Sequence, residues 1–161
     1  MEPLVECVPN ISEGRDVEKI KRIVDAASSF EGCAVLGVEP DVDYNRTVIT
    51  LAGTPASVSS AAFALVSMAI QEIDMQLHAG EHPRLGAVDV CPFVPLNGIT
   101  MSECADLARN LAQKVADSCE VPTFLYGAAA VNDSKSLLST IRKGEYAVSY
   151  THLTLPTILL V

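Results

Sequence analysis

Apolar positions along the chain alternate between short strand-like runs and longer stretches with helical spacing. The strand-like runs are residues 4–8, 33–38, 46–52, 88–94 and 122–126. Helical stretches follow Asp16, Thr54 and Ser102, whose side-chain oxygens can cap a helix, and a fourth begins at Asp133 or Ser134. The predicted order is therefore β-α-β-β-α-β followed by α-β-α.

This order predicts an α+β fold of the ferredoxin-like, split-βαβ type. Helices would cover one face of a mostly antiparallel sheet, and an αβα extension would follow. The run 33–38 is apolar throughout, which is typical of a strand buried on both faces, and the acidic residues 39–45 predict a turn after it. The helix from Pro55 to about Asp74 is apolar nearly all round, so we expect other structure to cover it.

The last residues differ in composition from the rest of the chain. Residues 148–161 contain no Asp, Glu, Lys or Arg. They resemble the translation of a transposase adapter used in sequencing libraries, which indicates a processing scar outside the fold; the alternative is a genuine edge strand. We therefore divide the chain into one incomplete domain, residues 1–147, and a non-native tail, residues 148–161, and assign no function to His152.

Length and charge narrow the classes of function. A chain of 161 residues has the length of one domain, and its net charge of −9 argues against general binding to nucleic acid or to an anionic membrane. The five cysteines are an odd number without a C-x-x-C pair, which is a poor basis for disulfides or zinc. No leader pattern and no apolar run of about 18 residues is visible, so we expect a cytoplasmic protein.

The densest group of reactive side chains lies in residues 78–89, between a helical stretch and a strand. A histidine there can act as acid or base near neutral pH, although a purely structural turn is the alternative. His78, Glu81 and His82 also fit the H-x-x-E-H pattern of zinc hydrolases. That pattern works on a helix, and Gly80 and Pro83 disfavour helix, so we expect no metal.

Several segments together carry a family resemblance. They are residues 4–14, Asn45-Arg46-Thr47-Val48, residues 80–93 with the specific block Gly80-Glu81-His82-Pro83-Arg84, Leu125-Tyr126-Gly127 and residues 141–146. Over about residues 2–146 the chain resembles glutamate formimidoyltransferase, which is also the front half of formimidoyltransferase–cyclodeaminase. The resemblance implies transfer of a formimino group from N-formimino-L-glutamate to the co-substrate tetrahydrofolate, in histidine degradation and one-carbon metabolism.

The resemblance also implies the roles of particular residues. The catalytic histidine of the family falls on His82, which would take a proton from the attacking N5 amine of tetrahydrofolate and return it to the leaving glutamate nitrogen. Both substrates carry carboxylates, so Arg46 and Arg84 are candidate clamps. Asn10 and Glu39 are expected to line the site. Some relatives carry Asp at the position of Glu39, which leaves its role open.

The chain departs from the family in its length. Family members continue into a second subdomain of similar fold and bind folate in the cleft between the two. We therefore expect this fragment to expose an apolar partner face and to be inactive or nearly so alone, and the full-length enzyme to be a homo-oligomer. The alternative function is a non-catalytic subdomain that binds folate or a partner and acts in trans.

Overall fold

The computed structural model describes residues 2–77, 80, 86–130 and 158–160, and every structural statement below concerns these residues. The elements in chain order are β1 (Leu4–Cys7), β2 (Asn10–Ile11), α1 (Val17–Ser28), β3 (Cys33–Asp41), β4 (Arg46–Gly53), α2 (Pro55–Glu72), β5 (Val88–Val90), β6 (Phe93–Asn97), α3 (Met101–Cys119), β7 (Thr123–Leu125), the 3-10 helix η1 (Gly127–Ala129) and β8 (Ile158–Leu160). The predicted α+β class is confirmed.

The sheet has the strand order of a split βαβ fold. β1 and β2 lie end to end along one edge of β4, and Pro9 separates them. β5 and β6 lie end to end along the opposite edge of β1 and β2, and Pro92 separates them. Proline has no N–H for a ladder, which explains both breaks. β3 pairs with the far side of β4, and all these pairs are antiparallel. β8 then pairs in parallel with β5 and β7.

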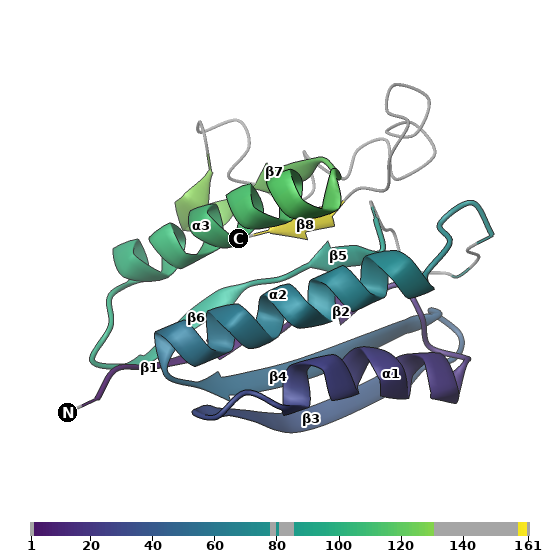
Figure 1. Ribbon diagram of the computed structural model, residues 1–161, viewed down its shortest axis with the longest axis horizontal. Helices are drawn as coiled ribbons and strands as arrows, with labels where there is room; N and C mark the ends of the chain where they lie inside the picture. The colour runs from purple at the N-terminus through teal and green to yellow at the C-terminus, as the bar shows by residue number, and fades with distance from the viewer. Residues whose placement is uncertain (1, 78–79, 81–85, 131–157, 161) are drawn as a thin grey trace.

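The helices form a single layer on one face of the sheet, as predicted (Figure 1). α2 lies between α1 and α3 and contacts both. Every second side chain along β4 is buried, and these side chains face the helix layer: Thr47, Ile49 and Leu51. The hydrophobic core therefore lies between α2 and the central strands, and α2 is covered on its sheet side as its apolar sequence predicted.

No described element covers the other face of the sheet, which we call the open face. Register places Ala34, Ala52, Glu6 and Val94 in one row across it, from β3 to β6. Val94 keeps 38% of its surface exposed. Exposed apolar side chains on a sheet face are typical of a surface that another domain covers.

Helix starts follow the predicted caps in two cases out of three. The Asp16 carboxylate accepts the Lys19 N–H at 3.0 Å, and Thr54 caps α2 directly before Pro55. The prediction that Ser102 caps α3 is wrong, because the cap is Thr100. Thr100 and Glu103 form a reciprocal capping box, in which the Glu103 side chain accepts the Thr100 N–H at 2.7 Å. Two terminal N–H groups are satisfied in this way, and the helix begins two residues earlier than expected.

The prediction that residues 33–38 form a strand buried on both faces is also wrong. Within the described part of the chain β3 pairs only with β4, so it is an edge strand, and Leu36 is 65% exposed. β3 also continues to Asp41, so that the turn is shorter than predicted. An apolar run shows that a strand is favoured, but it cannot show whether a second neighbour exists.

The structure does not test two further predictions, the fourth helix and the division of the chain at residue 147. The fourth helix, from Asp133 or Ser134, lies outside the described ranges. β8 belongs to the segment predicted to be a non-native tail, and the division at residue 147 stays a prediction. No helix in the described ranges is long and apolar enough to cross a membrane.

Candidate active site

A hollow of about 390 Å³ opens on the open face, where β3 ends and β4 begins. Its lining residues are Glu39, Pro40, Asp41, Tyr44, Arg46 and Val48. The register of the β3–β4 hairpin explains why they meet, since Glu39 pairs with Val48 and Asp41 pairs with Arg46. Asn10 on β2 pairs with Val48 from the other side and so joins the same face.

Arg46 is held in this hollow by the side chain of Asn10. Asn10 is buried, its amide donates to the Val8 carbonyl at 2.9 Å, and its Oδ1 accepts from Arg46 Nε at 2.8 Å and also from Nη2. The amide of Asn10 is neutral, so these bonds orient the guanidinium without neutralising its charge. A guanidinium fixed in this way suits recognition of a carboxylate.

Two carboxylates lie on the β3 side of the same hollow. Asp41 has a local structural role, because its Oδ1 accepts the Tyr44 N–H at 2.9 Å and closes the turn between the strands. Glu39 is exposed and lies two residues before Asp41 on the same face. The hollow therefore offers both signs of charge within one site, which suits a ligand that itself carries both.

Buried polar side chains tie three backbone segments together beside the hollow. Asn45 has the left-handed backbone angle φ 51°, and its Oδ1 accepts the Gly14 N–H at 2.9 Å. The Thr47 hydroxyl donates to the Glu13 carbonyl. The Ser12 hydroxyl donates to the Gly86 carbonyl at 2.7 Å. The segment 12–14 is thus fixed both to the β3–β4 turn and to the residues that lead into β5.

Two of the predicted site residues, Glu39 and Arg46, line this hollow, and a third, Asn10, holds Arg46 there. The other two, His82 and Arg84, lie outside the described residues. So do His78 and Glu81, the remaining members of the H-x-x-E-H pattern. Gly80, two residues before His82, is described, and it packs against Tyr44 in the β3–β4 turn.

Sequence reasoning missed Tyr44 and Asn45 as parts of this site. Asn45 was noticed only as part of a matching segment. A signal was present, because asparagine near the end of an acidic turn is one of the few residues that adopt a left-handed conformation at low cost.

Comparison with known proteins identifies the family. The sequence model of the formiminotransferase domain, N-terminal subdomain, matches residues 4–157. The chain belongs to this family. It is 47% identical over 146 residues to formimidoyltransferase-cyclodeaminase of Rattus norvegicus, a match that covers 91% of the chain and 27% of the relative.

Two relatives are named glutamate formimidoyltransferase. The protein of Streptococcus pyogenes serotype M1 is 42% identical over 146 residues, covering 91% of the chain and 49% of the relative. The protein of Thermoplasma acidophilum is 46% identical over 143 residues, covering 89% of the chain and 47% of the relative. The formiminotransferase chain thus spans a quarter to half of the length of these relatives, which continue well beyond the part it matches.

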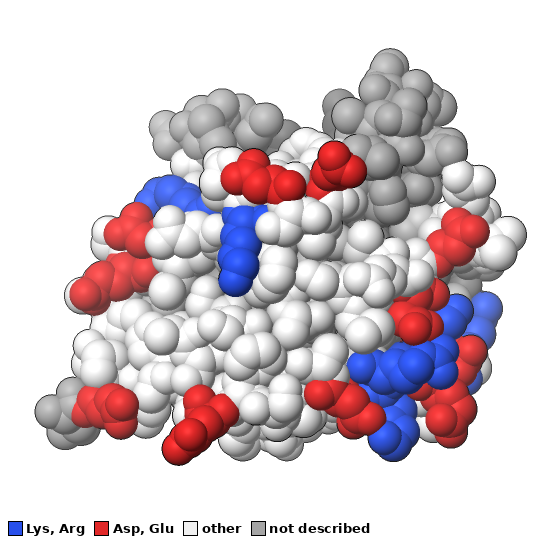
Figure 2. All heavy atoms as spheres, viewed as in Figure 1, with Lys and Arg blue, Asp and Glu red and all other residues white. Residues whose placement is uncertain are grey.

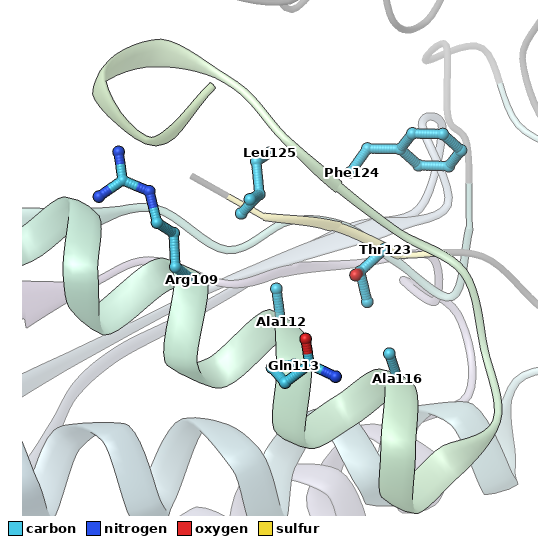
Figure 3. A pocket seen from close by; sticks show the side chains of 7 residues that line it. All are labelled: Arg109, Ala112, Gln113, Ala116, Thr123, Phe124 and Leu125. Atoms are coloured by element: carbon cyan, nitrogen blue, oxygen red, sulfur yellow. The ribbon is translucent and has the colours of Figure 1, made fainter. Parts of the chain in front are cut away.

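A second hollow of the formiminotransferase chain, about 300 Å³, lies between α3 and β7 (Figure 3). Thr123 and Leu125 point from β7 towards α3, whereas Phe124 points away. The Arg109 guanidinium donates to Asp106 at 2.9 Å and to the Ala128 carbonyl at 3.3 Å. Its cation is thus paired with a carboxylate, and none of the predicted site residues lines this hollow, so it is the weaker candidate.

Charged side chains on the helix-covered face lie mainly around its margin, and the basic ones do not join into one patch (Figure 2). Arg22 on α1 and Glu72 on α2 form a two-point ion pair at 3.1 and 2.8 Å. The hydrogen bond from Arg22 lowers the pKa of Glu72. This pair joins two helices on the covered face of the sheet, opposite the candidate site, and is structural.

The cysteines of the chain are all unpaired, and two of them lie close together in the core. Cys7 Sγ and Cys91 Sγ are 3.6 Å apart and both side chains are buried. Burial, and then the contact with Cys91, raises the pKa of Cys7 well above its usual value. The thiol of Cys7 therefore stays protonated, as expected of an inert core cysteine. No three His, Cys, Asp or Glu residues in the described ranges could hold a metal ion.

Proposed function

We propose that the protein of which this chain is part transfers the formimino group of N-formimino-L-glutamate to tetrahydrofolate, giving 5-formiminotetrahydrofolate and glutamate. The observation that supports this most is the hollow on the open face, in which Asn10 holds the Arg46 guanidinium and Glu39 adds a carboxylate. The relatives that share up to 47% identity carry this activity in their names.

The charges of the hollow match those of the donor substrate. N-formimino-L-glutamate has two carboxylates and an amidine, which is a cation at neutral pH. Arg46 would bind a carboxylate through its planar fork, and Glu39 would attract the amidinium. Arg84 is the second proposed clamp. The amidine carbon would then lie above the open face, where tetrahydrofolate can approach it.

The reaction needs one proton moved between two nitrogens. The N5 amine of tetrahydrofolate attacks the amidine carbon, the new N–C bond forms, and N5 loses its proton to His82. When the bond between that carbon and the glutamate nitrogen breaks, the imidazolium of His82 returns the proton to the leaving amine. A positioned base of this kind contributes about 10²–10⁴-fold.

Covalent geometry supports His82 for this role. His82 is two residues from Gly80 in the chain, and two residues span at most about 7 Å. Gly80 packs against Tyr44, which lines the hollow. This covalent limit supports the proposal that His82 acts on a substrate bound by Arg46.

We further propose that the remaining half of the protein covers the open face and closes the folate cleft. Two observations support this: the exposed Val94 and Leu96 on that face, and relatives about twice or more the length of the match. The chain alone should then be inactive or nearly so. We place the full protein in the cytoplasm, as a homo-oligomer that uses no metal.

The test is a chimera in which residues 1–146 replace the matching part of the Streptococcus pyogenes enzyme. Formation of 5-formiminotetrahydrofolate is followed spectroscopically. We expect turnover by the chimera, a loss of about 10²–10⁴-fold in kcat with His82→Ala, and a KM for formiminoglutamate about 10–100-fold higher with Arg46→Lys. Arg109→Lys, an arginine at the second hollow, is the matched control and should change neither constant.

A chimera that folds but does not transfer the group, or one that keeps its kcat with His82→Ala, would refute the proposed function. Robust turnover by the chain alone would refute the claim that the fragment is inactive. Mixing the chain with a separately produced second half tests the alternative. Restored turnover supports a split enzyme, whereas folate binding without turnover supports a non-catalytic subdomain.

A further inference from the structure

Glu6 places a carboxylate in the middle of an apolar part of the open face. Val5 and Cys7 are fully buried on the helix side, so the alternation along β1 turns the Glu6 side chain to the open face. Register places Ala52 of β4 and Val94 of β6 directly beside it. Because β1 has a paired strand on each side, Glu6 lies within the sheet rather than at its edge.

The side chains around Glu6 offer it no donor. Leu4, two residues earlier on β1, shares the open face and is 39% exposed. Among the described residues, none forms a hydrogen bond or an ion pair with the Glu6 carboxylate. The sequences of β1 to β6 contain one basic residue, Arg46, and Asn10 holds its guanidinium in the hollow.

Such a carboxylate is stable on a sheet face as long as water solvates it. In the proposed function a second half covers the open face and closes the folate cleft, and a charge removed from water needs hydrogen-bond donors. The neighbouring Leu4, Ala52 and Val94 cannot supply them. The donors therefore come from across the cleft, where tetrahydrofolate brings a matching pair.

The pterin ring of tetrahydrofolate is flat and neutral, and one of its edges carries two donors side by side, the N3–H and the 2-amino group. A carboxylate can accept both at once as a bidentate pair. The apolar side chains around Glu6 suit a flat neutral ring better than the amidinium of the other substrate, because a cation loses more free energy when it leaves water.

We propose that Glu6 binds this edge of the pterin and so determines specificity for a 2-amino-4-oxo heterocycle. The inference rests on the proposed function, in which tetrahydrofolate is the acceptor. The two carboxylates of the open face then have separate ligands, since Glu39 attracts the amidinium at the hollow and Glu6 binds the acceptor ring.

The separation between Glu6 and the hollow fits the two substrates in line. Glu6 pairs with Ala52, and Asn10 pairs with Val48, four residues earlier on β4; this is about 13 Å along the strand. When N5 is bonded to the amidine carbon, the N3 edge of the pterin lies about 9 Å from the nearer carboxylate of the donor. A hydrogen bond of about 3 Å at each end completes the span from Glu6 to the Arg46 guanidinium.

The experiment measures both Michaelis constants of the chimera described above with Glu6→Gln, which keeps the shape of the side chain but replaces one acceptor oxygen by a donor NH2. The KM for tetrahydrofolate should rise about 10–100-fold, whereas kcat and the KM for formiminoglutamate should stay within about threefold of the parent. Glu31→Gln, at an exposed position outside the sheet, is the matched control and should change none of the three.

A substrate analogue separates recognition from a structural role. Tetrahydrofolate with a methyl group in place of its 2-amino group lacks one of the two donors. The parent chimera should use it with a kcat/KM about 10-fold lower or less, and Glu6→Gln should use the two substrates almost equally. A structural role would weaken activity with both and leave the discrimination unchanged, which would overturn the proposal.

A second variant covers the case in which Glu6→Gln does not fold. Glu6→Asp keeps the charge but withdraws the carboxylate by one methylene group. It should also raise the KM for tetrahydrofolate and reduce the discrimination against the analogue; an Asp variant that matches the parent in both would overturn the proposal.

The outcomes keep this inference separate from the proposed function. Full kcat with His82→Ala refutes the proposed function, whereas a KM for tetrahydrofolate unchanged by Glu6→Gln in an active chimera overturns only the role of Glu6. A rise confined to the KM for formiminoglutamate also overturns it, because Glu6 would then bind the amidinium. If the chimera shows no turnover, the Kd for tetrahydrofolate from calorimetry decides: an increase with Glu6→Gln supports the role of Glu6, and an unchanged Kd overturns it.

Discussion

Asn45 gives the sharpest test of how the site is held together. Its backbone is left-handed, with φ 51°, and its side-chain Oδ1 accepts the buried Gly14 N–H at 2.9 Å. Asn45→Ala removes the acceptor and places an ordinary L-residue in a left-handed conformation. Asn45→Gly removes the acceptor but tolerates the conformation. The two variants therefore separate the hydrogen bond from the backbone strain.

The two contributions can be given magnitudes. An orphaned buried N–H costs about 1–3 kcal/mol, and a left-handed alanine adds about 1–2 kcal/mol. Asn45→Ala should then destabilise the chain by about 2–5 kcal/mol, and Asn45→Gly by about 1 kcal/mol less than that. The assay is urea unfolding of this chain followed by circular dichroism at low protein concentration, with the m-value checked for constancy.

The control is Asp43→Ala, an exposed position on the same turn, which should stay within about 0.5 kcal/mol of the parent. The reasoning is refuted if Asn45→Gly is as stable as the parent, because the bond to Gly14 would then contribute nothing. An alanine variant no less stable than the glycine variant would remove the strain argument instead.

Three further results are expected. Thr100→Ala should lower the free energy of unfolding in urea by about 1 kcal/mol. Hydrogen bonds from Thr100 lower the pKa of Glu103, so the free energy of unfolding should fall as pH drops through that lowered pKa, and Glu103→Gln should flatten this pH dependence. Leu65→Ala should cost about 2–5 kcal/mol because Leu65 is fully buried, whereas Leu77→Ala, at an 83% exposed site, should cost little. Cys7 should react with a thiol reagent at pH 8 only after unfolding, since burial raises its pKa, and peptide mapping distinguishes it from the partly exposed Cys33 and Cys119; fast labelling of Cys7 itself in the native protein would contradict this.

The sequence predicted the parts of the fold that depend on local chemistry. The caps at Asp16 and Thr54 and the alternation along β4 depend on neighbouring residues, and they agree with the structure. Where two local signals competed, the prediction was wrong: Ser102 and Thr100 can both cap a helix, and only the reciprocal bond with Glu103 favours Thr100.

The sequence by itself determined the order of elements, the family and the chemistry available at Asn10, Glu39, Arg46, His82 and Arg84. Only the tertiary structure decided that β3 pairs with β4 alone among the described residues, and that Glu39 and Arg46 line one hollow in which Asn10 holds Arg46. The register of β2, β3 and β4 makes that meeting. The pairing of β2 with β4 joins segments more than thirty residues apart, about which a local pattern carries no information.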